Sequence, residues 1–316
     1  MLLDTIAPVI PRLRHVAIDE ARLDQVCARL TPDGLRLPTW DDDVFITRPP
    51  EERASHILLF NTINFSYWGE PKWTIDFRGR PLDGAWGMLG ALARAVSDEG
   101  FRLFEGDYLA SIPEADLRHV LRGNVEIPMF RERLDILHQV GRTLVAEFGG
   151  SFVHLIHAAE HDAVALVRLL VTRFPSFDDV ATLDGQRLAF HKRAQLAAAM
   201  LYEAFDGQGL GELRRVDELT AFADYKLPQV LRRLGILRYA PDLAERVDRR
   251  ETLTAGSREE VEIRAATVWA CELMRRALGS RFPGMMALHV DYWLWHEGQA
   301  GGQAIRPYHR VRTIYY

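Results

Sequence analysis

One carboxylate, Asp224, stands out because the sequence places it directly before a predicted helix. Pro228 suits the first turn of that helix, and Gly235 suits its end. The positive end of a helix dipole favours an ionised carboxylate, so Asp224 would be poised as a charged group. An aspartate in this position can equally serve only as a helix cap. The pattern leaves both interpretations open.

Three histidines form a second candidate site. The stretch His157-Ala-Ala-Glu160-His161 matches the His-x-x-Glu-His zinc signature, and His154 adds a third imidazole at helical spacing. The match is short, and no separate acidic ligand can be identified. We therefore expect the histidines to lie on a polar helix face and predict no metal site.

Two stretches mix large aromatic rings with polar side chains. Residues 60–68 (FNTINFSYW) contain two asparagines, and residues 290–295 (VDYWLW) contain Asp291. Such stretches could pack in a core, or could stack on a heterocyclic base whose edge the polar groups bind. The sequence has no Gly-x-Ser-x-Gly elbow, phosphate-binding loop or dinucleotide glycine motif, so the usual support for those enzyme classes is missing.

Helical periodicity dominates the elements that must position these residues. Between Ile136 and Phe148, for example, apolar residues recur at spacings of three and four before a Gly-Gly pair. Further helices are predicted at about 19–30, 85–97, 114–122, 154–174, 190–205 and 257–278. Residues 217–235 predict a short helix, a tight turn and a second helix. Residues 73–80 predict one small β-hairpin, so we expect a mainly α multi-helix globule.

Composition restricts the class of protein. The chain has 316 residues, of which 48% are hydrophobic and 26% charged, and no linker-like segment divides it. We therefore predict a single domain over residues 1–316. A net charge of −5 disfavours a stable complex with nucleic acid, which requires a basic surface. A small-molecule substrate is the better expectation.

The sequence also bears on location. Charged residues interrupt the first thirty positions, and no apolar run approaches the roughly 20 residues that span a bilayer. We expect a cytoplasmic protein with no membrane partner. Cys27 and Cys271 are too few for a disulfide framework and are expected to be reduced core residues.

Several motifs, taken in order, carry a resemblance to a known family. They are residues 60–68 (FNTINFSYW), 84–86 (GAW), 148–152 (FGGSF), 174–177 (FPSF), 190–195 (FHKRAQ), 222–226 (FADYK), 260–264 (EVEIR), 291–295 (DYWLW) and 309–316 (HRVRTIYY). From about residue 57 to the C-terminus the chain resembles the queuosine salvage protein family. The resemblance implies a fold similar to helix-hairpin-helix DNA glycosylases. It also implies hydrolysis of queuosine 5′-phosphate to queuine and ribose 5-phosphate, without a metal or organic cofactor.

The resemblance also implies roles for particular residues. The family's catalytic aspartate falls on Asp224, and its base-binding positions fall on Phe222, Ala223, Asp291 and Tyr292. A further acidic contact to the base is assigned to Glu297, where an aspartate is expected. A histidine upstream of the Asn-Phe motif has no clear counterpart, since 41–44 occupies that region.

The substrate chemistry suits these assignments. Breaking an N-glycosidic bond builds positive charge on the sugar, which a carboxylate such as Asp224 could stabilise. Queuine carries a secondary amine that is cationic at neutral pH, and Asp291 and Glu297 are suitable partners for it. The 5′-phosphate needs a cation, for which Lys192 is the first candidate, with Arg193 or Lys226 behind it.

Two other functions remain compatible with the sequence. A non-catalytic queuine or nucleotide carrier could use the same aromatic and acidic pocket. A DNA or RNA glycosylase acting on a flipped base would fit the fold analogy but conflicts with the acidic net charge. We expect a monomeric enzyme acting on a free nucleotide.

Overall fold

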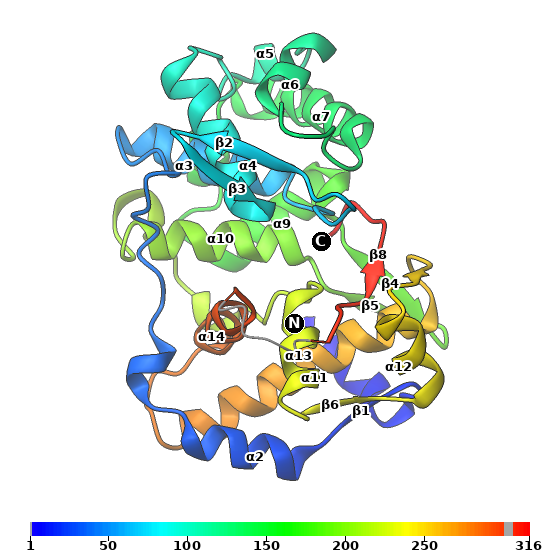
Figure 1. Ribbon diagram of the computed structural model, residues 1–316. Coiled ribbons are helices and arrows are strands. Elements are labelled where there is room, and N and C mark those ends of the chain that lie inside the picture. Colours follow the sequence, from blue (N-terminus) through cyan, green and yellow to red (C-terminus); the bar gives the residue numbers. More distant parts are fainter. Residues whose placement is uncertain (1, 300–305) are drawn as a thin grey trace.

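The computed structural model describes residues 2–299 and 306–316, and in this part of the chain the protein is mainly helical, as predicted (Figure 1). Its α-helices are α1 Leu2–Ile6, α2 Glu20–Arg29, α3 Pro50–Thr62, α4 Gly84–Ala93, α5 Gly106–Leu109, α6 Glu114–Val120, α7 Phe130–Phe148, α8 Phe152–His157, α9 Ala163–Arg173, α10 Lys192–Ala204, α11 Lys226–Arg233, α12 Pro241–Asp248, α13 Arg258–Gly279 and α14 Ala287–Gln299.

The strands of the described residues are short and pair two by two. They are β1 Val16–Ile18 with β6 Leu237–Tyr239, β2 Thr74–Phe77 with β3 Arg80–Asp83, β4 Val180–Leu183 with β5 Gln186–Ala189, and β7 Thr252–Leu253 with β8 Arg310–Val311. The first three pairs are antiparallel and the last is parallel. The predicted hairpin is β2–β3. The expectation of only one hairpin was wrong, because Asp184-Gly185 turns a second one, β4–β5, with positive φ at both residues.

Most predicted helices are confirmed, and recognisable end signals explain their bounds. The Asp19 side chain caps α2, and the Ser257 side chain caps α13. Helix α7 ends at Gly149, which adopts the left-handed conformation at φ 58°. The predicted helix at 85–97 is α4 followed by a π-helical turn at Arg94–Asp98.

The predicted helix over residues 154–174 is broken in two. Helix α8 ends at His157, and Glu160 and His161 take positive φ values of 50° and 58°. A new helix, α9, begins after Asp162, whose carboxylate accepts a hydrogen bond from Ala165 N at 2.8 Å. The backbone at the break forms hydrogen bonds with a distant part of the chain, since Arg214 N donates to His161 O at 2.8 Å. The apolar spacing of a helix therefore continues through the turn, which is why the sequence predicted one helix where the structure has two.

Residues 217–225 were predicted to begin with a short helix, but a 3-10 turn at Val216–Glu218 takes its place. Residues 219–224 are then extended and lead into α11. As predicted, Pro228 lies in the first turn of α11, and Gly235 follows its end with φ 77°.

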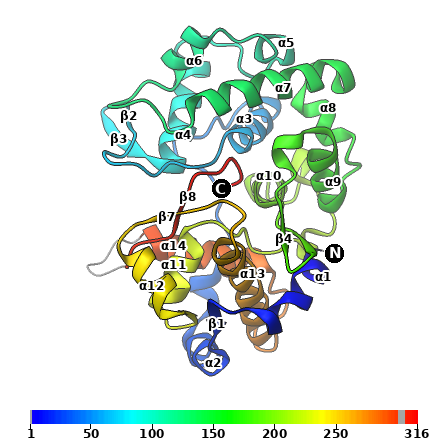
Figure 2. The same cartoon turned by 90° about the vertical axis from the view of Figure 1, so that its right-hand side faces the viewer.

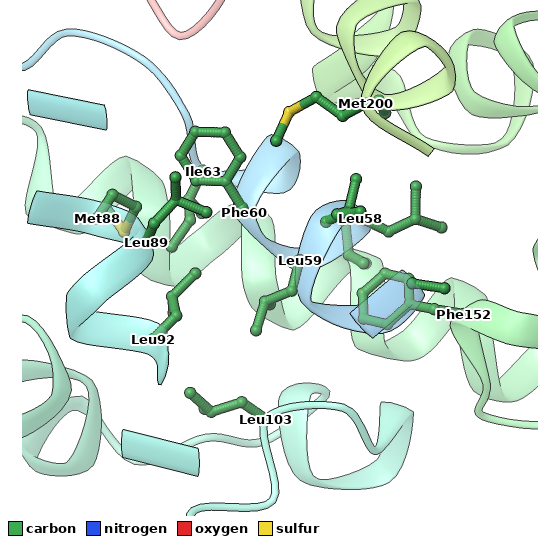
Figure 3. Close-up of a cluster of buried hydrophobic side chains, with 14 of the residues drawn as sticks. Leu58, Leu59, Phe60, Ile63, Met88, Leu89, Leu92, Leu103, Phe152 and Met200 are labelled. Carbon is green, nitrogen blue, oxygen red and sulfur yellow. The ribbon is translucent and has the colours of Figure 1, made fainter. Parts of the chain in front are cut away.

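Two large hydrophobic clusters and a smaller one, which joins α1, β4–β5 and α13, form the core of the described residues. The upper core is formed by buried side chains of residues 44–222 together with Leu288. Figure 3 shows part of it, where Leu59 and Phe60 of α3 lie among side chains of α4 and α10. The lower core is formed by residues 16–35 and 221–316. In Figures 1 and 2 most of the elements that contribute to the upper core lie in the upper half of the molecule and those of the lower core in the lower half, with α10 at the level between them.

The C-terminal segment, residues 306–316, runs between the two halves (Figure 2). Its upper contacts include Ser66 Oγ, which donates to Thr313 O at 2.8 Å, and Ser66 N, which donates to Tyr316 O at 2.9 Å. Its lower contacts include the Tyr316 hydroxyl, which donates to Glu260 Oε1 of α13 at 2.9 Å. The segment therefore ties the halves together by hydrogen bonds.

Candidate functional site

A cavity lies where the two cores meet, and most of the predicted site residues line it. It holds about 1290 Å³ of empty space, a volume that includes the open solvent at its mouth. Its walls come from the aromatic stretch 60–68, α4, α10, α14, the segment before α11 and the C-terminal segment. Many of the lining residues are aromatic, so the cavity offers flat apolar surfaces with polar groups between them.

Side chains from two helices hold the extended segment 219–224 in place. Gln195 of α10 accepts a hydrogen bond from Thr220 N at 2.8 Å and donates to Thr220 Oγ1 at 2.9 Å. Asp291 of α14 accepts from Phe222 N at 2.6 Å. These bonds replace the ones that a helix would supply, and explain why the segment stays extended although it is buried.

A buried ion pair holds the next residues of the segment. Arg264 of α13 donates from Nε to Ala223 O at 3.2 Å and from Nη1 to Asp179 Oδ1 at 2.8 Å. Asp179 also accepts from Lys192 N, the first amide of α10, at 3.2 Å. The start of α10 and the segment before Asp224 are thus fixed to the same buried pair.

Asp224 both caps a helix and lines the cavity. Its Oδ1 accepts hydrogen bonds from Lys226 N at 2.7 Å and Leu227 N at 2.9 Å, as an N-cap does. Its Oδ2 has no hydrogen bond to the described residues, and the residue contributes to the cavity wall. Burial raises the pKa of Asp224, while the Lys192 ammonium group and the two backbone N–H groups oppose the rise.

Lys192 is nearly inaccessible and lies close to two carboxylates. Burial lowers its pKa, and the nearby carboxylates of Asp224 and Asp291 counteract this. Burial also raises the pKa of Asp291 well above its usual range. Arg193, the second phosphate candidate, is not part of the cavity wall, because its guanidinium group is bound to carbonyl oxygens of residues 61, 62 and 176.

The structure brings together four of the five residues that were predicted to be closest to the reaction: Asp224, Phe222, Asp291 and Tyr292 line the cavity. Ala223 does not line the cavity, and its carbonyl oxygen accepts a hydrogen bond from Arg264. Glu297 also lies outside the lining, and its carboxylate forms an ion pair with Arg233 Nη2 at 2.8 Å.

The three histidines do not share a helix. His157 ends α8, while His161 follows in the turn, and its Nδ1 lies 3.0 Å from Glu212 O. The Nδ1 of His154 lies 3.1 Å from Phe148 O. The described residues contain no group of three His, Cys, Asp or Glu side chains placed to hold a metal ion.

Sequence reasoning missed one acidic group in the cavity, Glu203. Lys192, Leu196, Met200 and Glu203 follow one another at helical spacing along α10, and all line the cavity. That spacing is readable in the sequence and could have identified Glu203 once Lys192 was suspected. Trp40 was also missed, because it precedes the recognisable motifs, yet it lines the cavity where residues 41–44 do not.

Two lysines line the cavity near its mouth, and one of them is paired with an aspartate. Lys72 Nζ lies 3.3 Å from Asp83 Oδ2, and Lys226 Nζ lies 5.4 Å from the centre of the Tyr308 ring. All four side chains line the cavity. Burial lowers the pKa of Lys226, the Asp224 carboxylate opposes this, and the Lys72 ammonium group lowers it further. The two lysines are therefore near neighbours that repel each other.

Comparison with known proteins relates this site to a family. The profile of the family described as queuosine salvage protein matches residues 45–316. A Sphaerobacter thermophilus protein named queuosine 5′-phosphate N-glycosylase/hydrolase is 45% identical over 315 residues, which cover 100% of this chain and 97% of that protein. Proteins of the same name from Bos taurus and Dictyostelium discoideum are 34% and 33% identical, covering 96% and 84% of this chain and 95% and 79% of their own lengths. The chain therefore belongs to the queuosine salvage protein family.

Proposed function

We propose that this protein hydrolyses the N-glycosidic bond of queuosine 5′-phosphate and releases queuine and ribose 5-phosphate. The names of its relatives support the reaction. The observation that carries the proposal is Asp224, a carboxylate in the wall of a cavity lined by aromatic side chains, with one oxygen fixed by two backbone N–H groups. This arrangement is suited to stabilising a cation that forms during a reaction.

Asp224 is the catalytic residue in this proposal. As the bond between sugar and base lengthens, positive charge develops on the sugar carbon and ring oxygen. The Oδ2 atom faces that charge directly or activates the water that attacks the sugar carbon. The Lys192 ammonium group favours the ionised form of Asp224, because it opposes the rise in pKa that burial causes.

The base lies against the aromatic wall. Phe222 and Tyr292 offer ring surface to the deazapurine, and both line the cavity. Asp291 acts first as a positioning residue, because its carboxylate holds Phe222 N at 2.6 Å. It thereby fixes the segment that ends at Asp224.

The 5′-phosphate lies at the mouth, between Lys72 and Lys226. Lys192, the first candidate from the sequence, is instead buried beside the carboxylates of Asp224 and Asp291. An anion placed between two mutually repelling lysines is stabilised by both of them. The cavity then offers carboxylates to a cationic base and lysines to an anionic phosphate.

The proposal extends to the setting of the reaction. No helix in the described ranges is long and apolar enough to cross a bilayer. We place the enzyme in the cytosol as a monomer that acts on the free nucleotide and not on polynucleotides, in keeping with the net charge of −5.

The direct test is incubation with queuosine 5′-phosphate, followed by mass spectrometry of the products. Queuine and ribose 5-phosphate should appear in equal amounts with catalytic turnover. Binding without conversion would favour the carrier alternative. A protein that neither binds nor converts the nucleotide would refute both functions.

A further inference from the structure

Helix α10 runs along the cavity and carries a charged residue at each end of its lining face. Lys192 and Glu203 are separated by eleven residues, or three turns, so their Cα atoms lie about 16 Å apart along the helix axis. Lys192 marks the end where Asp224 lies. Glu203 lies at the opposite end of this wall, and both ends line the same cavity as Asp224.

The carboxyl group of Glu203 has no basic partner among the described residues. Its Oε2 accepts a hydrogen bond from Trp40 Nε1 at 2.6 Å, and Oε1 has no hydrogen bond to the described part of the protein. Burial raises the pKa of Glu203 to about 8, although the Trp40 hydrogen bond lowers it, and the Asp291 carboxylate adds to the rise. Removing a carboxylate from water without a cationic partner costs free energy, so the absence of a basic side chain beside Glu203 in the described part of the chain is unusual.

Four aromatic rings surround this end of the cavity in a closed circuit of contacts. The ring centres are 6.5 Å apart for Trp40 and Trp86, 6.0 Å for Trp86 and Trp295, 5.8 Å for Trp295 and Tyr292, and 5.8 Å for Tyr292 and Trp40. All four side chains line the cavity. Glu203 lies near this circuit, because its charge contributes to the raised pKa of Tyr292 after burial, the main cause.

A carboxylate beside aromatic faces is the arrangement that binds organic ammonium ions. We propose that Glu203 and the four rings form a subsite for an organic cation, and that this subsite receives the protonated secondary amine of queuine. The identity of the cation rests on the proposed function. The subsite takes over the role that the sequence gave to Asp291 and Glu297, whose carboxylates are bound to Phe222 N and Arg233.

The test compares two bases by calorimetry, queuine and 7-deazaguanine, which lacks the amine. In Glu203→Gln the side chain keeps its size and can still accept the Trp40 hydrogen bond, but it has no charge. Queuine affinity should fall at least about tenfold, while 7-deazaguanine affinity should change little. The matched control is Glu297→Gln, which lies outside the cavity wall and should leave both affinities unchanged.

A second readout separates a cation site from a merely structural glutamate. With a pKa of about 8, Glu203 is mostly protonated at pH 7, and a bound cation favours its ionised form. Queuine binding should therefore release up to about one proton, measured from the heat of binding in buffers of different ionisation enthalpy. The release should disappear in Glu203→Gln and persist in Glu297→Gln.

The outcomes are distinct. Equal losses for both bases, an unchanged queuine affinity, or proton release that persists in Glu203→Gln would overturn the subsite while leaving hydrolysis by the wild type intact. A loss confined to Glu297→Gln would return the amine to the position that the sequence suggested. A wild-type protein that binds neither base would overturn the subsite and the proposed function together.

Discussion

At the scale of single residues, the two oxygens of Asp224 have different surroundings. Oδ1 accepts two backbone hydrogen bonds, and Oδ2 accepts none from the described residues. Capping and catalysis, which the sequence left as alternatives, are therefore compatible in one side chain. A substitution that keeps the cap and removes the charge separates them.

Asp224→Asn should reduce turnover at least about a hundredfold, because the amide lacks the charge that stabilises the sugar cation. The amide oxygen can still accept both backbone hydrogen bonds, since asparagine is an equally good cap. Melting temperature and queuine affinity should therefore stay close to those of the wild type. All three quantities are measured on one preparation. Retained turnover would leave Asp224 as a cap only.

Activity should be lost on acidification at a higher pH than for an ordinary aspartate, whose pKa is about 3.9. Asp224 must be ionised to act, and burial raises its pKa. In Lys192→Met the ammonium group that opposes the rise is gone, so the acid limb of kcat/KM should move to still higher pH. Lys226→Met is the control and should move it less, since Lys226 makes the weaker electrostatic contribution. An unmoved acid limb in Lys192→Met would contradict this role.

Phosphate binding can be assigned by comparing queuosine 5′-phosphate with the unphosphorylated nucleoside. Lys226→Ala and Lys72→Ala should lower kcat/KM about tenfold or more for the nucleotide and little for the nucleoside, because their charge matters only where a phosphate is present. Lys192→Ala should impair both substrates. A loss in Lys192→Ala that is confined to the nucleotide would support the assignment made from the sequence.

At the scale of elements, the extended segment 219–224 depends on side chains of other helices. Gln195→Met should lower the free energy of unfolding by about 1–3 kcal/mol, because it leaves the buried Thr220 N–H without a partner. Turnover should fall as well, since the segment leads to Asp224. Denaturant titration measures the first effect. The control is Gln208→Met at an exposed position, which should change neither the free energy of unfolding nor the turnover. If Gln195→Met were as stable and as active as the wild type, the segment would not depend on the hydrogen bonds of Gln195.

Local signals in the sequence predicted the elements whose ends are set by local chemistry. Helices α2, α7 and α13 follow from caps, a glycine and periodicity. The break at residues 158–162 and the extended segment 219–224 could not be predicted in this way, because their backbones bond to residues far away in the sequence. The motifs indicated Asp224 and Asp291. Glu203 lies outside them, and although its helical spacing from Lys192 is readable in the sequence, its contact with the distant Trp40 is not.

At the scale of the whole molecule, the C-terminal segment bonds to both halves, and the cavity lies where they meet. We therefore propose that the chain is one cooperative unit and should unfold in a single calorimetric transition. Removal of residues 313–316 should lower the melting temperature and abolish turnover, because Tyr316 lines the cavity. Two transitions in the intact protein would show that the halves are separate domains.

The make-up of the lower core has a consequence for biosynthesis. Its first contributors, residues 16–35, leave the ribosome early, but their partners begin only at residue 221. The middle of the chain can assemble the upper core in the meantime. During this time the apolar face of α2 stays exposed unless a chaperone binds it, because its packing partners have not yet been made. The pocket is complete only when Tyr316 has emerged. We therefore expect a chain that ends before this point to be inactive and to expose the apolar face of α2 to proteases.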